Sequence, residues 1–267
     1  MLTNFIATIL NEPQAIEEIR TRQDSIQRRM LTSSAWVKSP NFTFIHDDDL
    51  QLLFRWYDET FFQFAITREI RRASSSLGFR MSSRLTSAGA KTLYFRSKPK
   101  GRKPFFEIAV STTLLAESFQ APDQVHTVVG LPCATRIDAL QRLFEHELIH
   151  LIELLVFKNS SCTAQRFKTL ATNTFGHRCS HHELLRPVDR ARMDFGIAVR
   201  DRVSFQIAGR KYEGVVNRIT KRATVLVPDA NGERFSDGRC YLKFLVPVDD
   251  LTRLSEEFAP ATKVASA

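Results

Sequence analysis

The sequence predicts an α+β protein in which helices around a small antiparallel sheet precede a small all-β barrel. Apolar residues recur at helical spacing in several segments of the first 175 residues, which favours helices that bury one side. Three strand-like runs, "LGFRMSSRL", "KTLYFRS" and "FFEIAVS", lie between residues 77 and 111 and are separated by turn-forming residues. From about Gly196 to Leu254 the sequence alternates in five short runs with tight turns, which is typical of a small barrel.

The order of these patterns divides the chain into four parts. Residues 1–40 are predicted to be an N-terminal helical extension, and residues 41–190 the main domain. The small basic barrel is expected over residues 196–255. Residues 256–267, which end in "ATKVASA", are expected to be disordered.

The main domain is predicted to contain three principal helices around the three strands. A long helix follows Asp49, and the strands after it form an antiparallel meander. A capping-box pattern at Thr135 begins a helix that runs to about Phe157. A further helix begins near Thr163 and ends at Gly176.

The composition is that of a globular chain with an excess of positive charge. Of the 267 residues, 43% are hydrophobic and 25% are charged. With 38 Lys and Arg against 29 Asp and Glu, the formal net charge is +9, which predicts attraction to nucleic acid first and to an anionic surface second. No stretch approaches the roughly 18 uninterrupted apolar residues of a membrane span, so we expect no membrane partner.

The cysteines indicate a reducing compartment. The four cysteines are scattered without a Cys-x-x-Cys pair, which argues against a disulfide framework or a zinc ribbon. The apolar first ten residues lack a basic start and a cleavage site, which favours a short helix over a secretion signal. We therefore expect a cytoplasmic protein, and the basic charge adds association with the nucleoid as an alternative within that compartment.

The stretch "FEHELIHLIELL" contains the pattern His146-Glu147-x-x-His150 inside a predicted helix. Residues four apart on a helix differ by about 40° in direction, so the two histidines project from one face, one turn apart. Two imidazoles at this spacing can chelate one Zn²⁺, and Glu147 beside them can act as general base toward a zinc-activated water. The alternative is a pair of core or capping histidines.

The third ligand of such a zinc site has several candidates in the sequence. A catalytic zinc generally takes three protein ligands and leaves the fourth position open. Because the first helix runs well beyond its second histidine, an antiparallel second helix returns to the level of the zinc only near its end, where His177 is the first good ligand. Cys162 is nearest if the loop between the helices folds back, and His181 and His182 are further alternatives.

These residues resemble the SprT-like zinc metalloproteases over about Asp49 to Leu185. The resemblance rests on "LFRWYDETFF", on "LGFRMSSRLTSAGAKT" followed by "FFEIAVS", and on "LQRLFEHELIHLIELL" and "RFKTLA...FGH". It implies a zincin-like α+β fold, Zn²⁺ held by His146 and His150, Glu147 as catalytic base, and proteins as substrates. Members of the family are associated with cleaving proteins bound or crosslinked to DNA, which fits the basic charge.

The chain departs from the family pattern in two places. The family commonly has its third histidine at the start of the second helix, four residues before an aromatic residue. Thr163 occupies that position here, with Cys162 beside it, so the third ligand is either Cys162 in a shifted version of that place or His177. The family's frequent C-terminal zinc ribbon is absent, and the basic β-rich segment in its place resembles a Tudor-like or KOW-like barrel.

The function predicted from these patterns is a zinc-dependent metalloprotease, with nucleic-acid-associated proteins as one class of substrate. The "FFEIAVS" run is either the strand to which an extended peptide substrate pairs or a plain internal strand. His126 and Tyr94 are candidates, beside the unused histidines, for stabilising the oxyanion. The alternatives are a zinc hydrolase for another substrate, or a non-catalytic zinc-containing nucleic-acid-binding or adaptor protein, which a closed four-ligand site would favour.

The barrel segment carries the candidate nucleic-acid contacts. In "VVNRITKRATVLV", Arg218, Lys221 and Arg222 surround one turn between strands. Cations grouped in this way can bind phosphates without regard to sequence. A solvated basic turn is the ordinary alternative.

Overall fold

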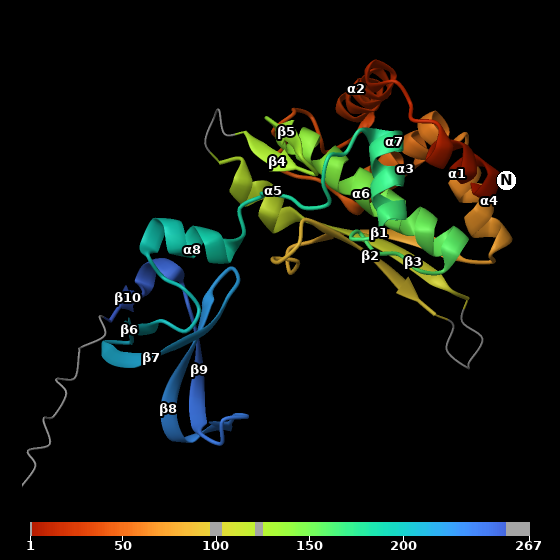
Figure 1. Ribbon diagram of the computed structural model, residues 1–267. Helices are drawn as coiled ribbons and strands as arrows, with labels where there is room; N and C mark the ends of the chain where they lie inside the picture. The colour runs from red at the N-terminus through yellow and green to blue at the C-terminus, as the bar shows by residue number, and fades with distance from the viewer. Residues whose placement is uncertain (1, 97–102, 121–124, 255–267) are drawn as a thin grey trace, which may run out of the picture. The chain divides into compact units, whose positions relative to one another are not determined.

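The computed structural model divides the chain into two compact units, Met1–Leu185 and Arg186–Ala267 (Figure 1). It describes residues 2–96, 103–120 and 125–254. The division falls a few residues before the predicted end of the main domain at residue 190. The tail predicted over residues 256–267 lies outside the described residues.

The first 40 residues, which we predicted to be an N-terminal helical extension, are helical and contribute to the core of the first unit. They form α1 (Leu2–Asn11) and α2 (Ile16–Ser33). One side of each helix is buried in the same hydrophobic cluster as the rest of the unit, through Leu2, Ile6, Ile9, Ile19, Ile26 and Met30. The apolar side of the extension is therefore covered within the unit itself.

A three-stranded sheet lies beneath the helices of the first unit (Figure 1). It contains β1 (Ser76–Ser82), β2 (Ala90–Phe95) and β3 (Phe105–Ser111) in the order β1-β3-β2. The pair β2–β3 is antiparallel, but β1 and β3 are parallel, so the predicted antiparallel meander is wrong. The most apolar strand, β3, lies in the middle, where both of its faces can be covered.

The position of β3 decides one prediction about substrate binding. Its backbone pairs with β1 on one side and with β2 on the other. An added peptide needs a free strand edge, so "FFEIAVS" is an internal strand and cannot receive one. The edge strand beside the helix of the His-Glu-x-x-His pattern is β2.

The remaining elements of the first unit lead up to and follow that helix. They are α3 (Asp47–Phe62), α4 (Ala65–Arg72), α5 (Thr112–Ser118), β4 (His126–Val128), β5 (Leu131–Cys133), α6 (Arg136–Phe157) and α7 (Gln165–Phe175). The capping box at the start of α6 is confirmed, because the Thr135 side chain accepts from the Asp138 backbone N–H and Asp138 accepts from Thr135. Gly176 ends α7 with a φ of 72°, as its sequence position predicts.

A fully buried carboxylate, Glu145, fixes the rotation of α6 in the core. Its oxygens accept hydrogen bonds from Tyr57 Oη on α3 at 2.7 Å and from Gln23 Nε2 on α2 at 2.8 Å. Arg142 Nη1 donates to it at 2.8 Å and supplies the opposite charge, and His177 Nε2 lies 3.0 Å away. Because an unpaired charge in this place would be very costly, α6 can take only the rotation that satisfies Glu145.

The second unit begins with α8 (Pro187–Phe195) and continues as an antiparallel sheet. Its strands are β6 (Arg202–Ile207), β7 (Arg210–Ile219), β8 (Ala223–Arg234), β9 (Cys240–Val246) and β10 (Thr252–Arg253), in the order β10-β6-β7-β8-β9. A separate apolar core, which includes Val203, Phe205 and Val225, lies within this unit. We predicted a small β-barrel for this unit. The described strands form one sheet with β9 and β10 at its edges, and closure of that sheet into a barrel is not observed.

No helix in the described part of the chain is long and apolar enough to cross a membrane.

Candidate metal centre

Helix α6 carries His146 and His150 on one face with their ring nitrogens together. Their Nε2 atoms lie 3.1 Å apart. Two nitrogens that bind the same tetrahedral Zn²⁺, each at about 2.1 Å, would be separated by roughly 3.4 Å. The observed distance is close to that value, so the local helix geometry already brings two donors to the spacing of a shared ion.

Cys162 completes the group. The Cys162 thiol sulfur and one ring nitrogen of each histidine lie within 4.8 Å of one another. Helix α6 ends at Phe157, and Lys158 adopts a left-handed conformation with a φ of 61°, which turns the chain back toward the helix. The loop therefore folds back, which is the condition under which Cys162 becomes the nearest ligand.

His177, the ligand that we favoured from the sequence, lies outside this group. Its side chain is buried, and Nε2 hydrogen-bonds to Glu145 instead of pointing to the two histidines. The prediction assumed that no loop residue could reach the zinc before the second helix returned to its level, and the reversal at Lys158 removes that assumption. Among the described residues, only His146, His150 and Cys162 form a cluster of this kind.

His181 and His182, the other candidates for the third ligand, make different contacts. Nε2 of His181 lies 3.8 Å from the sulfur of Cys179. Nε2 of His182 accepts a hydrogen bond from the backbone N–H of Gly89 at 2.9 Å. Neither residue joins the metal-ligand cluster formed by the described residues.

A chain of hydrogen bonds, missed in the sequence, orients His150. Its Nδ1 lies 2.7 Å from Ser160 Oγ, and Ser160 donates to Glu153 Oε2 at 2.7 Å. Since the serine proton goes to the carboxylate, Nδ1 carries the proton that Ser160 accepts, and Nε2 keeps a free lone pair. Arg166 Nε holds the other oxygen of Glu153 at 2.6 Å. The sequence feature that could have indicated this chain is Glu153, an acidic residue three positions after His150.

The environment keeps both imidazoles neutral. Burial lowers the pKa of His146 to about 3, and the nearby His150, His177 and His182 add to the effect. Burial also lowers the pKa of His150. The ring of Phe167 packs against both, with centroids 4.8 Å from His146 and 4.5 Å from His150. Neutral imidazoles in an apolar surrounding offer the lone pairs that a metal requires.

Glu147 lies on the side of α6 that faces the edge strand. Its carboxyl group is buried, and the hydroxyl of Thr92 on β2 lies 2.7 Å from Oε2. Burial raises the pKa of Glu147 to about 7, while the hydrogen bond from Thr92 opposes the shift. A carboxylate with a pKa near neutrality is well matched to accepting and returning a proton.

The two candidates for oxyanion stabilisation differ in their surroundings. His126 uses its Nε2 on the backbone carbonyl of Ser118, and its ring meets that of Phe119 edge-on. Tyr94 lies two residues after Thr92 on β2, so both side chains are on the same face of the strand. The ring of Tyr94 stacks on Phe106, with centroids 4.7 Å apart. The role of either residue in stabilising the oxyanion stays a prediction.

No family model, curated protein or solved structure matches this chain. The resemblance to SprT-like proteases therefore stays an expectation from sequence patterns. The roles of the residues in the centre depend on their chemistry and geometry alone.

Replacing Cys162 with alanine should abolish tight zinc binding, because two histidines remain of three donors. Replacing it with histidine should preserve binding, since imidazole is also a good zinc ligand. Zinc content by mass spectrometry and competition with a chromophoric chelator measure the effect. Cys179→Ala is the matched control and should bind as the wild type does. Loss of binding in His177→Gln, with binding retained in Cys162→Ala, would restore His177 as the third ligand.

Replacing Ser160 with alanine should weaken zinc binding by roughly 10- to 100-fold, the usual cost of losing a residue that orients a metal ligand. The reason is that His150 loses the partner that fixes its proton on Nδ1. Ser161→Ala is the control, because among the described residues that hydroxyl hydrogen-bonds only to Thr163. Equal affinities of the two variants would show that the hydrogen-bond chain does not orient His150.

Proposed function

We propose that this protein is a zinc-dependent metalloprotease that hydrolyses peptide bonds. The observation that supports it most is the convergence of His146, His150 and Cys162, with Glu147 adjacent on the same helix and facing the edge strand β2. Three donors leave one coordination position for water or substrate, which is the arrangement of a catalytic zinc site.

Each residue of the site has a separate proposed role. His146, His150 and Cys162 would hold the ion, and a bound Zn²⁺ would supply Lewis-acid chemistry, polarising a carbonyl group and acidifying water. Glu147 accepts the proton of the attacking water and passes it to the leaving amine. Phe167, packed against both imidazoles, limits the access of bulk water to the ligands.

Strand β2 is the element best placed to bind an extended peptide. It pairs with β3 on one side, and the other side is a sheet edge. Its residue Thr92 contacts the proposed base, so a peptide added at this edge would pass beside Glu147. Backbone pairing makes few demands on sequence, which suits a protease that acts on many proteins.

The SprT-like resemblance and a zincin-like core belong to the same proposal. They are supported by a long helix that carries the His-Glu-x-x-His pattern beside a sheet whose edge strand is antiparallel. A ligand at the loop before α7 corresponds to the place where the family commonly has its third histidine. Proteins in the cytoplasm, including those associated with nucleic acid, are the proposed substrates.

The alternative, a non-catalytic adaptor that keeps zinc for structure, would need a closed site. Structural zinc usually has four protein ligands. The cluster among the described residues offers three, which favours catalysis over a purely structural role.

Replacing Glu147 with glutamine should reduce proteolysis of casein by more than 100-fold while zinc binding persists, because the amide cannot accept the proton. Since the base must be unprotonated, wild-type kcat/KM should fall as the pH drops through the raised pKa of Glu147. Zinc content and product formation are measured on the same samples, with Glu12→Gln, a change at an exposed residue, as the control. Retained cleavage by Glu147→Gln would exclude this mechanism.

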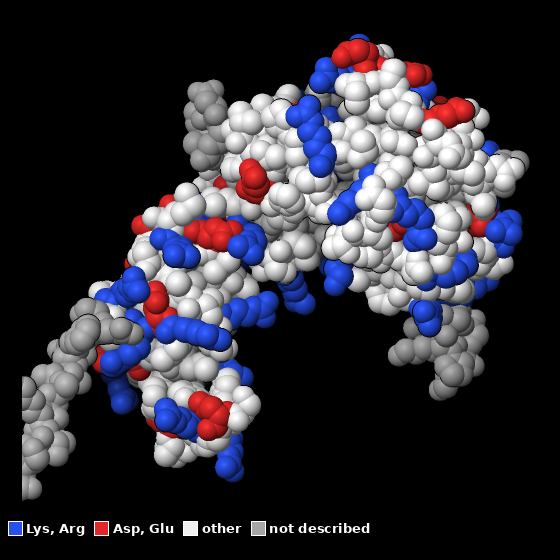
Figure 2. Space-filling view, viewed as in Figure 1, with Lys and Arg blue, Asp and Glu red and all other residues white. Residues whose placement is uncertain are grey.

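We propose nucleic-acid binding as an additional function of the second unit. Arg218 on β7 and Lys221 and Arg222 in the β7–β8 turn are exposed. None of the three has an ion pair within the described part of the chain, whereas Lys211 and Lys243 of the same sheet pair with glutamates. Cationic side chains are spread over both units on the face in Figure 2, which suits weak, sequence-independent contact with phosphates.

Replacing Arg218, Lys221 and Arg222 together with alanine should weaken DNA binding and reduce the slope of log affinity against log salt by up to about 3, one unit for each phosphate that is no longer bound. Fluorescence anisotropy with a labelled duplex at several salt concentrations measures both quantities. Lys243→Ala, which removes a paired cation, is the control. An unchanged slope in the triple variant would exclude this surface.

A further inference from the structure

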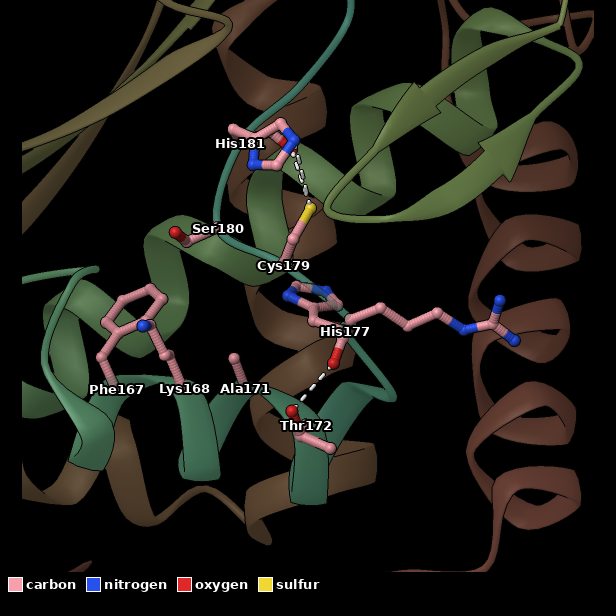
Figure 3. Close-up of a pocket in the computed structure, with 9 residues that line it drawn as sticks. Phe167, Lys168, Ala171, Thr172, His177, Cys179, Ser180 and His181 are labelled. Atoms are coloured by element: carbon pink, nitrogen blue, oxygen red, sulfur yellow. Dashed lines mark hydrogen bonds between the residues drawn. The ribbon is translucent and has the colours of Figure 1, made fainter.

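A pocket of about 320 Å³ lies between α7 and the segment 177–181 (Figure 3). Phe167, Lys168, Ala171 and Thr172 line it from α7, and His177, Arg178, Cys179, Ser180 and His181 line it from the segment. This volume is within the usual range of small-molecule and side-chain pockets. It is large enough for one long amino-acid side chain.

The pocket adjoins the candidate metal centre through Phe167. Phe167 forms part of its wall and also packs against the rings of His146 and His150. The segment that forms the opposite wall continues to His182, which accepts a hydrogen bond from Gly89, immediately before β2. The chain thus runs from the end of α7 through the segment to a contact at the start of β2, the strand to which we propose that the peptide adds.

The wall formed by the segment is held in place by the β4–β5 hairpin. The backbone N–H groups of Arg178 and Cys179 donate to the carbonyl of Val129 at 2.9 and 3.2 Å, and Val129 donates to the carbonyl of His181 at 2.8 Å. Gly130, with a φ of 77°, lies so close that an added Cβ would contact Arg178 at 2.7 Å. The pocket is therefore pre-formed by backbone contacts.

The lining of the pocket favours an anionic group. It includes Lys168 and Arg178 and no Asp or Glu. In the parts of the chain that the structure describes, neither cation has a side-chain hydrogen bond or ion pair, and the hydroxyl of Ser180 also lacks a partner. Figure 3 shows the hydrogen bonds from Thr172 to His177 and between Cys179 and His181, whereas Lys168 and Ser180 make none in this view.

The nearest buried acid does not cancel this charge. Glu145 approaches His177 from the side of the core, and Arg142 already balances it. Phe167 and Ala171 supply apolar surface for the methylene groups of a ligand. A glutamate side chain combines a short apolar stem with a terminal carboxylate, which corresponds to both parts of the lining.

We infer that this pocket receives an acidic side chain of the peptide substrate, near the bond that is cleaved. The inference rests on the proposed protease function and adds a substrate class to it. Lys168 is then a specificity-determining residue, which contacts the carboxylate at the pocket without taking part in bond cleavage. One charge-assisted contact of this kind corresponds to about a tenfold preference in kcat/KM.

The test compares three internally quenched peptides with blocked ends that differ only in carrying Glu, Gln or Lys beside the cleaved bond. A digest of a denatured protein mixture first identifies the position at which acidic residues are enriched. The zinc-loaded wild type should prefer Glu over Gln by about tenfold. Lys168→Glu should lose this preference and favour Lys, whereas Lys211→Glu, an equal charge change on the second unit, should behave as the wild type does.

The outcomes separate this inference from the protease proposal. Cleavage without an acidic preference, or a preference unchanged in Lys168→Glu, overturns the pocket's role and leaves the protease intact. If the zinc-loaded protein cleaves no peptide, the protease proposal fails. Binding of the blocked Glu and Gln peptides, measured by fluorescence anisotropy, then decides whether the pocket receives an acidic side chain. Equal binding of the two peptides to the wild type would then overturn it, and tighter Glu binding that disappears in Lys168→Glu would support it.

Discussion

The buried carboxylate of Glu145 is the constraint on which the geometry of the first unit depends. A charge removed from water requires a balancing charge and a full set of donors, and Arg142, Tyr57, Gln23 and His177 provide them. These partners come from α2, α3, α6 and the segment after α7. One side chain therefore holds four parts of the first unit together and leaves α6 with a single rotation.

The rotation of α6 determines the direction of the residues that follow Glu145. Successive residues on a helix differ by about 100°, so Glu145, His146 and Glu147 point to three different surroundings. Glu145 meets the helical core, His146 meets Phe167 on α7, and Glu147 meets Thr92 on β2. The buried structural charge, the candidate metal ligand and the proposed base are thus consecutive in sequence and lie in different surroundings.

The candidate centre is built from one rigid element and one loop that needs support. His146 and His150 are spaced by the helix itself, whereas Cys162 depends on the path of the chain after Lys158. The loop is tied down by Ser160, whose hydroxyl links His150 to Glu153, and Arg166 holds that carboxylate from α7. The contacts that orient one ligand therefore also position the loop that carries another.

The sequence by itself determined those features of the protein that short-range geometry controls. Helical spacing placed His146 and His150 on one face, and the capping pattern at Thr135 marked the start of α6, because both depend only on residues within one or two turns. The tertiary structure decided the third member of the candidate cluster and the order of the strands in the sheet. Cys162 rather than His177 joins the cluster because the chain reverses at a left-handed Lys158, a position that no side-chain pattern marks. Strand β3 lies between β1 and β2 because pairing between distant segments follows burial of the whole layer, which alternation within one strand does not encode.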